Sequence, residues 1–341
     1  MQKMLTAGPL LDEHGCLIQA GYATRLVKTY DRTKIKASPL RIKEWDYYLI
    51  ANDCHALALT IADNGYMGLI SWSLLDFNRA WEQTTSKMTF FPMGRTGLPA
   101  TSVTGSVQAE GKDYKMVFEN DGKKRRLYGN CRRFCGNRPL TFDISLTEPP
   151  QDSMVIATPF HKKKAFYYNQ KINCIRAEGR AFLGDEEILF PPATTSAVLD
   201  WGRGVWTYDN TWYWSSASGF VNGKRFGFNL GYGFGDTSAA SENMLFYGGK
   251  AHKLSQVTFE IPQKNGRDDF LSPWLFTSDD GRFEATFTPI LDRAALTDFK
   301  LLCSDQHQVF GWFDGQAILD NGEKIPLRHF LGFAEKVRNK W

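Results

Sequence analysis

Five of the Asn-Gly and Asp-Gly dipeptides in this chain of 341 residues each lie between two short runs in which apolar and polar residues alternate. Asn, Asp and Gly adopt the positive φ angles of tight hairpin turns at low cost, and alternation with a period of two is typical of half-buried strands. No segment shows a convincing pattern of apolar residues at helical spacing, and the sequence is compatible with a short helix only near 75–81 or 292–299. The sequence therefore predicts an all-β protein. The five dipeptides begin at Asn64, Asp121, Asn222, Asp280 and Asn321.

Four segments of the first half recur in the second half in the same order. The strongest match joins 179–183 to 315–319, and the others join 142–147 to 283–288, 88–91 to 244–247, and 45–47 to 212–214. The separation between matched segments shrinks steadily toward the C-terminus, as differences in loop length between two copies would produce. We therefore predict an internal duplication in preference to chance similarity.

Each copy is a unit of meandering strands, and such a unit removes its exposed edges most simply by closing into a barrel. Two tandem antiparallel β-barrels are therefore the predicted architecture, with a pair of sandwiches as the alternative. Pro191 and Pro192 interrupt the strand pattern and indicate the join. The expected domains are an N-terminal barrel over 1–190 and a C-terminal barrel over 191–341.

Composition and motifs argue against several functional classes. The net charge of +4 is small for this length, and the basic clusters at 123–126 and 161–164 do not interleave with aromatic rings, so we expect no nucleic-acid partner. The first 15 residues carry no signal-peptide pattern, and no run of about 20 apolar residues occurs, so we expect a cytoplasmic protein without stable membrane insertion. Histidine and cysteine spacings match no zinc motif, and no GxGxxG element precedes a helical pattern, so we expect neither a metal nor another cofactor. The oligomeric state stays open.

Several motifs resemble the bacterial family known as domain of unknown function 2804. They are Leu40–Tyr48, Ile61–Tyr66, Asp200–Trp206, Trp212–Trp214 and Gly332–Trp341, and the resemblance covers essentially the whole chain. That family is distantly similar to tandem lipocalin-like (calycin) proteins, which include the hydroxyneurosporene synthase group that hydrates carotenoid double bonds. The resemblance implies two calycin-type barrels and an apolar or isoprenoid-like ligand. It carries over no catalytic residue, because the acid and histidine motif of the hydratases has no match here.

An acid, an arginine and a tryptophan recur with the same spacing near the end of each copy. In lipocalin-like barrels an arginine packs across a tryptophan at the closed end, where cation–π stacking and an ion pair seal the barrel. We therefore interpret this repeated motif mainly as a structural device for barrel closure. Its members are Asp200, Arg203 and Trp206 in the first copy and Glu335, Arg338 and Trp341 in the second.

Residues without a counterpart in the other copy are better candidates for function. Trp212 and Trp214 alternate with Tyr213 on one predicted strand, so their indoles point to the same side and could line an apolar cavity. An ordinary barrel core and an ordinary Asp-Asn turn are the alternative interpretations of this region. The candidate ligand-binding residues are Tyr208, Trp212, Trp214, Tyr232 and Glu242, and the candidate catalytic residues are Asp209, Asp236 and His161.

Three functions remain open at this point. The first is binding of a hydrophobic small molecule at a barrel mouth or between the barrels, with or without acid–base hydration or isomerisation. The second is a non-enzymatic structural or interaction module whose tryptophans fill two sealed barrels. The third is a carbohydrate-active enzyme, for which paired carboxylates across a groove are typical.

Overall fold

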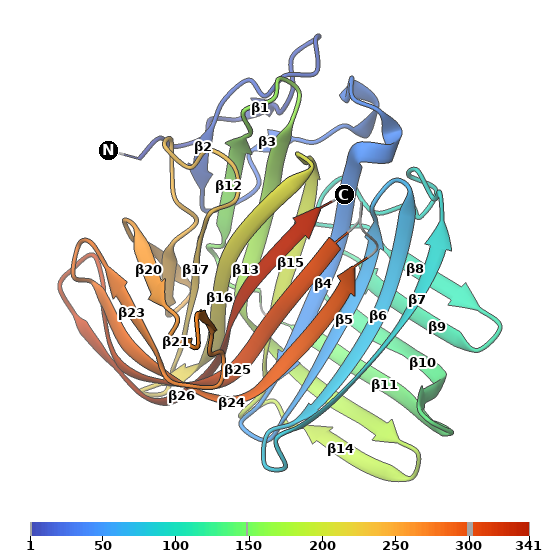
Figure 1. Ribbon diagram of the computed structural model, residues 1–341, viewed down its shortest axis with the longest axis vertical. Coiled ribbons are helices and arrows are strands. Elements are labelled where there is room, and N and C mark those ends of the chain that lie inside the picture. Colours follow the sequence, from blue (N-terminus) through green and yellow to red (C-terminus); the bar gives the residue numbers. More distant parts are fainter. Residues whose placement is uncertain (1, 148, 299–302, 341) are drawn as a thin grey trace.

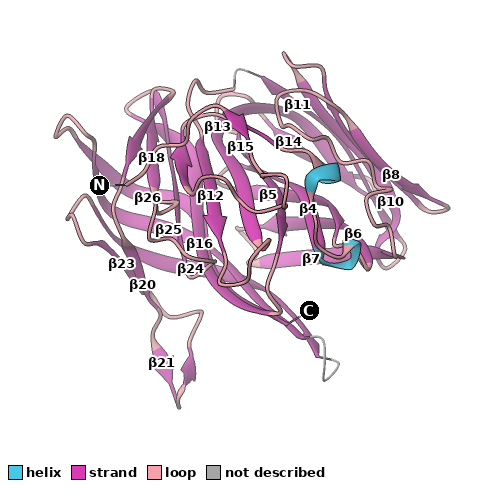
Figure 2. Ribbon diagram, turned by 90° about the horizontal axis from the view of Figure 1, so that it is seen from above, coloured by secondary structure: helices cyan, strands magenta, loops and turns pink. Residues whose placement is uncertain are grey.

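The structure is a computed structural model that describes residues 2–147, 149–298 and 303–340. Two strongly curled antiparallel sheets lie beside each other, with the second formed by the C-terminal part of the chain (Figure 1). The predicted all-β architecture of two tandem barrels is confirmed. Within the described residues, helical structure is limited to two 3-10 turns, η1 (Arg32–Lys34) and η2 (Pro39–Arg41) (Figure 2). No described helix has the length and apolar character that crossing a bilayer requires.

The first sheet contains 13 strands. β12 (Met154–Pro159) and β14 (Glu186–Phe190) pair with the two ends of the long strand β13, and β2 (Gly21–Ala23) pairs with β12. The main path, in hydrogen-bonded order, is β7 (Trp81–Phe90), β6 (Met67–Asp76), β5 (His55–Asp63), β4 (Ile42–Ala51), β15 (Ser196–Val205), β13 (Phe166–Leu183), β11 (Arg138–Thr147), β10 (Arg125–Cys135), β9 (Tyr114–Asn120) and β8 (Val107–Gly111).

The second sheet contains nine strands. Two small ribbons lie outside the large sheets: β1 (Gly8–Pro9) with β3 (Lys28–Thr29), and β21 (Gln263–Lys264) with β22 (Arg267–Asp268). The path of the second sheet is β19 (Lys250–Lys253), β18 (Met244–Tyr247), β17 (Lys224–Tyr232), β16 (Asp209–Val221), β26 (Lys324–Lys340), β25 (Cys303–Ile318), β24 (Phe283–Asp298), β23 (Trp274–Ser278) and β20 (Val257–Glu260).

All five predicted hairpin turns are confirmed. They connect β5 to β6, β9 to β10, β16 to β17, β23 to β24, and β25 to β26. The β16–β17 turn shows the reason, because Asn222 and Gly223 both take positive φ angles of 52° and 75°. The two short helices that the sequence allowed do not form. Residues 75–76 end β6, and residues 292–298 continue β24 in register with β25, whereas Phe299 lies outside the described residues.

The duplication is confirmed by the strand registers. The order β4–β15–β13–β11 in the first sheet is repeated as β16–β26–β25–β24 in the second. Gly179 pairs with Ile144, and its matched residue Gly315 pairs with Ala285, which is the residue matched to Ile144. A Cβ added at either glycine would lie 2.2 Å from a carbonyl oxygen of the paired strand, so both copies require glycine at this crossing.

The change from one sheet to the other differs from the predicted boundary. β15 pairs with both β4 and β13, so it belongs to the first sheet. The change therefore falls between Val205 and Asp209, beyond the predicted join at 190–191. The two prolines do interrupt the strand pattern, but the chain returns to the same sheet after them.

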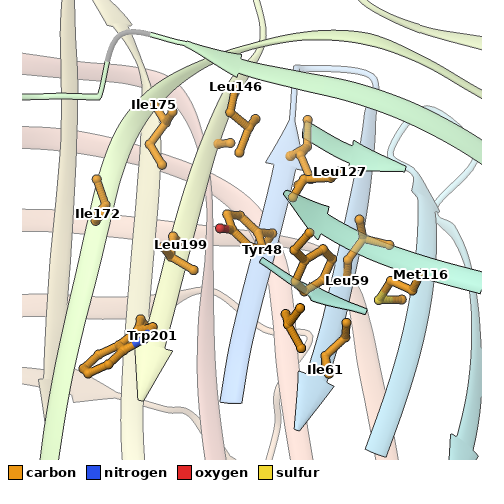
Figure 3. Close-up of a cluster of buried hydrophobic side chains, with 14 of the residues drawn as sticks. Tyr48, Leu59, Ile61, Met116, Leu127, Leu146, Ile172, Ile175, Leu199 and Trp201 are labelled. Atoms are coloured by element: carbon orange, nitrogen blue, oxygen red, sulfur yellow. The ribbon is translucent and has the colours of Figure 1, made fainter. Parts of the chain in front are cut away.

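Large apolar clusters fill the interior of each barrel. In the first, Tyr48, Leu59 and Trp201 pack around the inner face of the sheet (Figure 3). Alternation along β4 directs Tyr48 into this core and the adjacent Tyr47 to the opposite face, where it packs with Trp214 of the second barrel. The contact between the barrels is thus made by the outward faces of β4 and its neighbours.

Candidate functional site between the two barrels

Matched residues of the two copies meet where the barrels contact each other. Tyr47 on β4 corresponds to Trp214 on β16, and their rings meet edge to face with centroids 6.1 Å apart. The cross-strand partner of Tyr47 is Asp200, and that of Trp214 is Glu335. Both carboxyl groups contribute to raising the pKa of Tyr47, after the larger effect of burial. The duplication therefore brings one acid from each copy to the same place.

A third matched pair completes this arrangement. Lys171 on β13 lies opposite Asp200, and Gln308 on β25 lies opposite Glu335. None of these residues exposes more than 8% of its surface. We call the six residues the inter-barrel cluster: Tyr47, Lys171, Asp200, Trp214, Gln308 and Glu335.

The half of the cluster from the first barrel is a buried ion pair. Lys171 Nζ lies 3.0 Å from Asp200 Oδ1. The same oxygen accepts a hydrogen bond of 2.6 Å from Asn169 Nδ2. Lys171 Nζ also lies 3.9 Å from the ring centroid of Trp214, so it reaches across to the second barrel. Removing either charge would leave the other buried without a partner, which is strongly destabilising.

The half from the second barrel is centred on Glu335. Trp212 Nε1 donates to Glu335 Oε1 and Gln308 Nε2 donates to Glu335 Oε2, each at 2.9 Å. Arg293 Nη2 donates to Gln308 Oε1 at 2.6 Å, which orients the Gln308 amide so that its NH₂ group faces the carboxyl. Burial raises the pKa of Glu335 to about 7, although these two hydrogen bonds and the charge of Lys171 favour the ionised form.

A third carboxyl group lies close to these two. Glu242 is buried, and burial raises its pKa, while the charge of Lys171 opposes the rise. The pKa of Tyr167 is raised well above its ordinary value by burial and then by Glu242, Asp200 and Glu335. The buried phenol of Tyr167 therefore interacts electrostatically with all three acids, and so does the ammonium group of Lys171.

Aromatic rings form the wall next to the acids. Trp212 and Trp206 meet with centroids 5.7 Å apart, and Phe234 contacts both rings at 5.2 and 4.8 Å. Tyr167 lies 4.9 Å from Phe234 and stacks on Trp45 at 6.1 Å. The cluster therefore combines a carboxyl group that titrates near neutrality, a buried ion pair and an apolar wall.

The three predicted catalytic residues lie on the surface and apart from this cluster. Asp209 is exposed and pairs with Arg338 Nη2 at 3.2 Å, and the hydrogen bond from Arg338 is the main cause of its lowered pKa. Asp236 is exposed in the loop after β17, where it accepts a hydrogen bond from Ser238 N at 3.0 Å. His161 is exposed in the turn between β12 and β13. His161 and Asp236 lie in a turn and a loop, whereas Asp209 is the first residue of β16, and all three are exposed.

The predicted ligand-binding residues divide into two groups. Trp212, Trp214 and Glu242 belong to the inter-barrel cluster or its immediate surroundings. Tyr208 is 41% exposed. Tyr232 instead stacks on Tyr213 at 4.5 Å at the rim of the second barrel core. Its hydroxyl accepts a hydrogen bond from Phe259 N at 3.3 Å, and burial raises its pKa to about 12.

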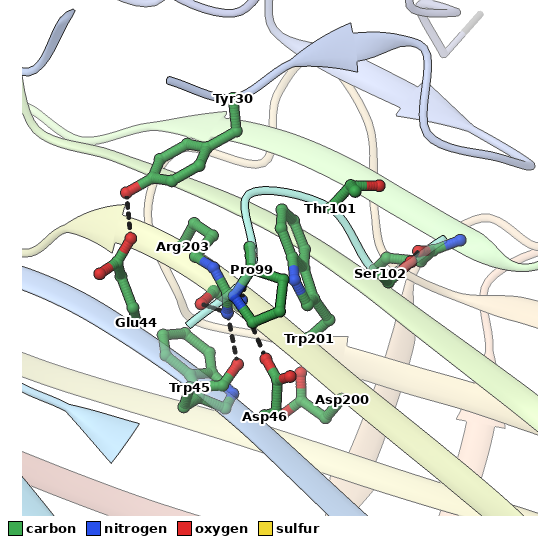
Figure 4. A network of polar contacts seen from close by, with 12 residues as sticks. Tyr30, Glu44, Trp45, Asp46, Pro99, Thr101, Ser102, Asp200, Trp201 and Arg203 are labelled. Atoms are coloured by element: carbon green, nitrogen blue, oxygen red, sulfur yellow. Dashed lines mark hydrogen bonds and ion pairs between the residues drawn. The ribbon is translucent and has the colours of Figure 1, made fainter. Parts of the chain in front are cut away.

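The arginine of the first repeated motif is fully buried and is the centre of a polar network (Figure 4). The guanidinium of Arg203 pairs with Asp46 at 3.0 Å and donates to the carbonyl oxygens of Trp45 and Pro99, both at 2.7 Å. Its cation lies 4.2 Å from the ring of Trp201. The predicted stacking of an arginine on a tryptophan is thus found, but with Trp201, whose ring faces the barrel interior. Trp206 instead packs between the two barrels, against Phe234.

The second copy of the motif does not repeat this arrangement. Glu335 is a member of the inter-barrel cluster, and the side chain of Arg338 is 54% exposed in its pair with Asp209. Trp341 lies outside the described residues. The matched acids Asp200 and Glu335 are both buried between the barrels, whereas the matched arginines differ: Arg203 is buried and Arg338 is exposed.

Sequence reasoning missed Tyr47, Lys171 and Gln308. The available signal was the match of 45–47 to 212–214, because it pairs Tyr47 with an already suspected tryptophan. Lys171 is also the one charged residue in the run from Phe166 to Ile175, whose other members are apolar or uncharged. Recognising Lys171 as a member of the cluster required the register between β13 and β15. The sequence does not show which strands pair or in which register.

Two hollows occur away from the cluster. A cavity of about 320 Å³ opens at the end of the first barrel, and its lining is mixed: the apolar Leu74, Trp81, Leu183 and Ile188 share it with the polar or charged His55, Asp76, Arg79, Arg138 and Glu186. A wider groove of about 540 Å³ crosses the outer face of β10, β11 and β13, where Asp143 is already paired with Arg126 at 2.6 Å. No group of three or more His, Cys, Asp or Glu side chains arranged to hold a metal ion occurs among the described residues.

Solved structures with a similar fold have two such lobes. The structure of kievitone hydratase from Nectria haematococca matches with a TM-score of 0.55 and 12% identity, covering 93% of this chain and 97% of that chain. An AttH-candidate protein from Nitrosomonas europaea, NE1406, matches with a TM-score of 0.50 and 14% identity, covering 87% and 92%. At these identities the likeness concerns the fold alone. Curated protein sequences give no match. The family described as domain of unknown function DUF2804 matches residues 1–341, and the chain therefore belongs to that family.

Proposed function

We propose that this protein binds a hydrophobic, unsaturated small molecule between its barrels and catalyses acid–base chemistry on a double bond, with hydration as the first reaction to test. One observation carries the proposal: Glu335 is a buried carboxyl group with a pKa raised to about 7, set against indole rings. A general acid or base works best when its pKa lies near the working pH. A buried carboxyl group with only a structural role in the contact between the barrels would more commonly be fully paired with a cation.

The residues divide naturally into roles for hydration. Glu335 in its acid form would donate a proton to one alkene carbon, which leaves a carbocation at the other carbon. A water molecule would then add to the cation, and its extra proton would pass to the Glu335 carboxylate, so that the net change is addition of one water. The ion pair of Asp200 and Lys171 would orient this water. In isomerisation the cation would instead lose a proton from a neighbouring carbon.

The apolar wall fits the proposed substrate class. The faces of Trp206, Trp212 and Phe234 offer an environment for hydrocarbon and for the positive charge that develops on protonation. The kievitone hydratase of similar fold is by its name a hydratase. That name supports testing hydration before other acid–base reactions.

Substrate entry would require Phe234 to move. It sits in the loop after β17 between Gly233 and Gly235, whose φ angles are 89° and 75°. The loop is attached to the end of β12 by the hydrogen bond from Asp236 N to Pro159 O, at 2.8 Å. Displacement of one ring on a glycine-flanked loop would open the aromatic wall without moving either barrel.

The test uses purified wild-type protein, Glu335→Gln and the matched control Glu284→Gln, which changes an exposed residue of the same barrel. Each is incubated with a panel of isoprenoids, unsaturated fatty acids and flavonoids, and products are measured by mass spectrometry. We expect wild type and control to add one water to at least one compound, and Glu335→Gln to lose on the order of 100-fold or more in rate. Tryptophan quenching should report retained binding in Glu335→Gln. Equal turnover by Glu335→Gln and wild type would refute the proposal.

A second candidate function is carriage of a hydrophobic ligand without turnover in the mouth of the first barrel. The observation that favours it is the cavity of about 320 Å³, whose lining includes Leu74, Leu183 and Ile188 and whose volume is within the usual range of ligand sites. Leu183→Trp would fill this cavity. Loss of binding in Leu183→Trp together with unchanged binding in Glu335→Gln would favour the carrier, and the opposite pattern would favour the inter-barrel site.

A further inference from the structure

Five large apolar side chains are exposed at one end of the first barrel. Phe90 is 78% exposed and Phe91 52%, although aromatic residues of this size usually contribute to a core. We call this surface the apolar ledge. Its members are Leu40, Met88, Phe90, Phe91 and Met93, and even the least exposed of them, Met93, exposes 38% of its surface.

Backbone contacts hold the ledge together. Phe90 pairs with Met67 at the start of β6, and Phe91 N donates to Tyr66 O at 2.8 Å. Met93 N donates to Gly65 O at 3.2 Å. Gly65 in turn packs against residues 39–40, where an added Cβ would lie 2.7 Å from the Leu40 carbonyl. The ledge is therefore one continuous surface made by the η2 turn, the β5–β6 turn and the end of β7.

The backbone of the ledge is unfavourable for the residues it carries. Phe91 and Met93 have φ angles of 51° and 49°, in the left-handed region where a bulky side chain is strained. Glycine or asparagine would occupy these positions at lower cost. Strain of about 1 kcal/mol or more at each position, combined with the exposure of both side chains, brings no gain in the stability of the fold. It points to an interaction surface.

The surroundings of the ledge are basic. The segments 32–43 and 87–97 together contain seven Lys or Arg residues and no Asp or Glu. Some of these cations have partners: Arg32 pairs with buried Glu44, and Lys87 pairs with Asp113 at 2.8 Å. Lys34, Lys36 and Arg95 are exposed. An approaching surface would therefore meet protruding apolar side chains with positive charge around them.

We propose that the apolar ledge docks this protein on the surface of an anionic lipid bilayer. Protruding rings on short loops, without a groove between them, suit insertion into the boundary between headgroups and acyl chains. The basic segments complement the negative surface of such a membrane. Docking would be peripheral. It does not depend on the proposed reaction, although a hydrophobic substrate dissolved in the membrane would become accessible through it.

Vesicle flotation tests this proposal with wild-type protein. The vesicles are pure phosphatidylcholine or phosphatidylcholine with one third phosphatidylglycerol, each at 50 and 500 mM salt. We expect binding to the anionic vesicles at low salt, with much weaker binding to the neutral vesicles and at high salt, because salt screens the charge attraction. The double variant Phe90→Ser with Phe91→Ser should bind at least about tenfold more weakly, and Lys34→Glu with Lys36→Glu at least about fivefold more weakly.

Two controls and a second measurement separate docking from misfolding and self-association. Leu271→Ser removes an exposed leucine of the other barrel, and Lys123→Glu with Lys124→Glu reverses charge at the exposed β9–β10 turn. Both should bind vesicles like wild type, and all variants should keep the wild-type melting temperature. No vesicle binding by wild type, or equal binding by the Phe90 and Phe91 double variant, would overturn the proposal. So would dimerisation in solution that this double variant abolishes, because a second copy would then cover the ledge.

Discussion

Replacing the acid of Glu335 by an amide should make the protein more stable at neutral pH, and the gain should grow with pH. Burial raises the pKa of this carboxyl from 4.5 to about 7. Each unit of pKa difference corresponds to about 1.36 kcal/mol, so the ionised form is destabilised in the fold by about 3 kcal/mol. Between pH 4.5 and 7 the folded state binds more protons at this site than the unfolded state does. The wild type therefore loses this stability as the pH rises through that window.

Glu335→Gln has no proton to lose, so it escapes this pH dependence. Its new amide can still accept the hydrogen bond from Trp212, but its NH₂ group would face the NH₂ group of Gln308, which Arg293 holds in place. A constant penalty of about 1 kcal/mol follows from the lost hydrogen bond. The free energy of unfolding of the variant, minus that of the wild type, should therefore rise by about 3 kcal/mol from pH 4.5 to pH 7.5.

Urea unfolding followed by tryptophan fluorescence measures this difference at half-unit steps between pH 4.5 and 8. Other titrating groups are common to both proteins and largely cancel in the difference. The control Glu284→Gln, at an exposed position of the same barrel, should show a flat difference. A difference for Glu335→Gln that changes by less than about 1 kcal/mol across the window would refute the raised pKa, and with it the general acid in the proposed function.

Three further outcomes follow from the same contacts. Lys171→Met removes a charge that lowers the pKa of Glu335, so the pH window of the preceding experiment should move upward; an unmoved window would argue against the electrostatic contact. Gly179→Ala and Gly315→Ala each place a Cβ 2.2 Å from a carbonyl oxygen, so both should lower the free energy of unfolding by about 2 kcal/mol or more, and a tolerated alanine at either site would contradict the matched registers. Arg203→Met leaves its buried carboxylate partner unpaired and should cost about 3–5 kcal/mol in urea unfolding, whereas a loss below about 1 kcal/mol would mean that the ion pair adds little to barrel closure.

Much of the architecture was predictable from local patterns. Asn-Gly and Asp-Gly turns act through the backbone preferences of two adjacent residues, so all five could be located without tertiary information. The duplication left matched segments whose pairing the structure reproduces, as at Gly179 and Gly315. The two prolines near 190 interrupt the pattern between two strands of the same sheet, so the chain enters the second sheet only after Val205.

The candidate site was predicted only in part. Trp212 and Trp214 were identified because aromatic clustering is visible in one strand, and Glu242 because it is a carboxyl group in the Ser-rich loop after the glycine-rich run. Asp209 and Asp236 were also suspected as acids, yet both are exposed, the first at the start of β16 and the second in a loop. A sequence lists carboxyl groups without their burial, and burial is what separates Glu335 from them.

The strands, their turns and the existence of two copies can be read from the amino-acid sequence, because they depend on neighbouring residues and on internal similarity. The approach of Asp200 and Glu335 to the same lysine depends instead on the folded arrangement, because most of the second barrel separates them along the chain. The physical reason is that strand register selects which face of each sheet a residue occupies, and the packing of the outward faces then removes water from both acids. The buried ion pair of Asp200, the raised pKa of Glu335 and the proposed chemistry between the barrels all follow from that packing.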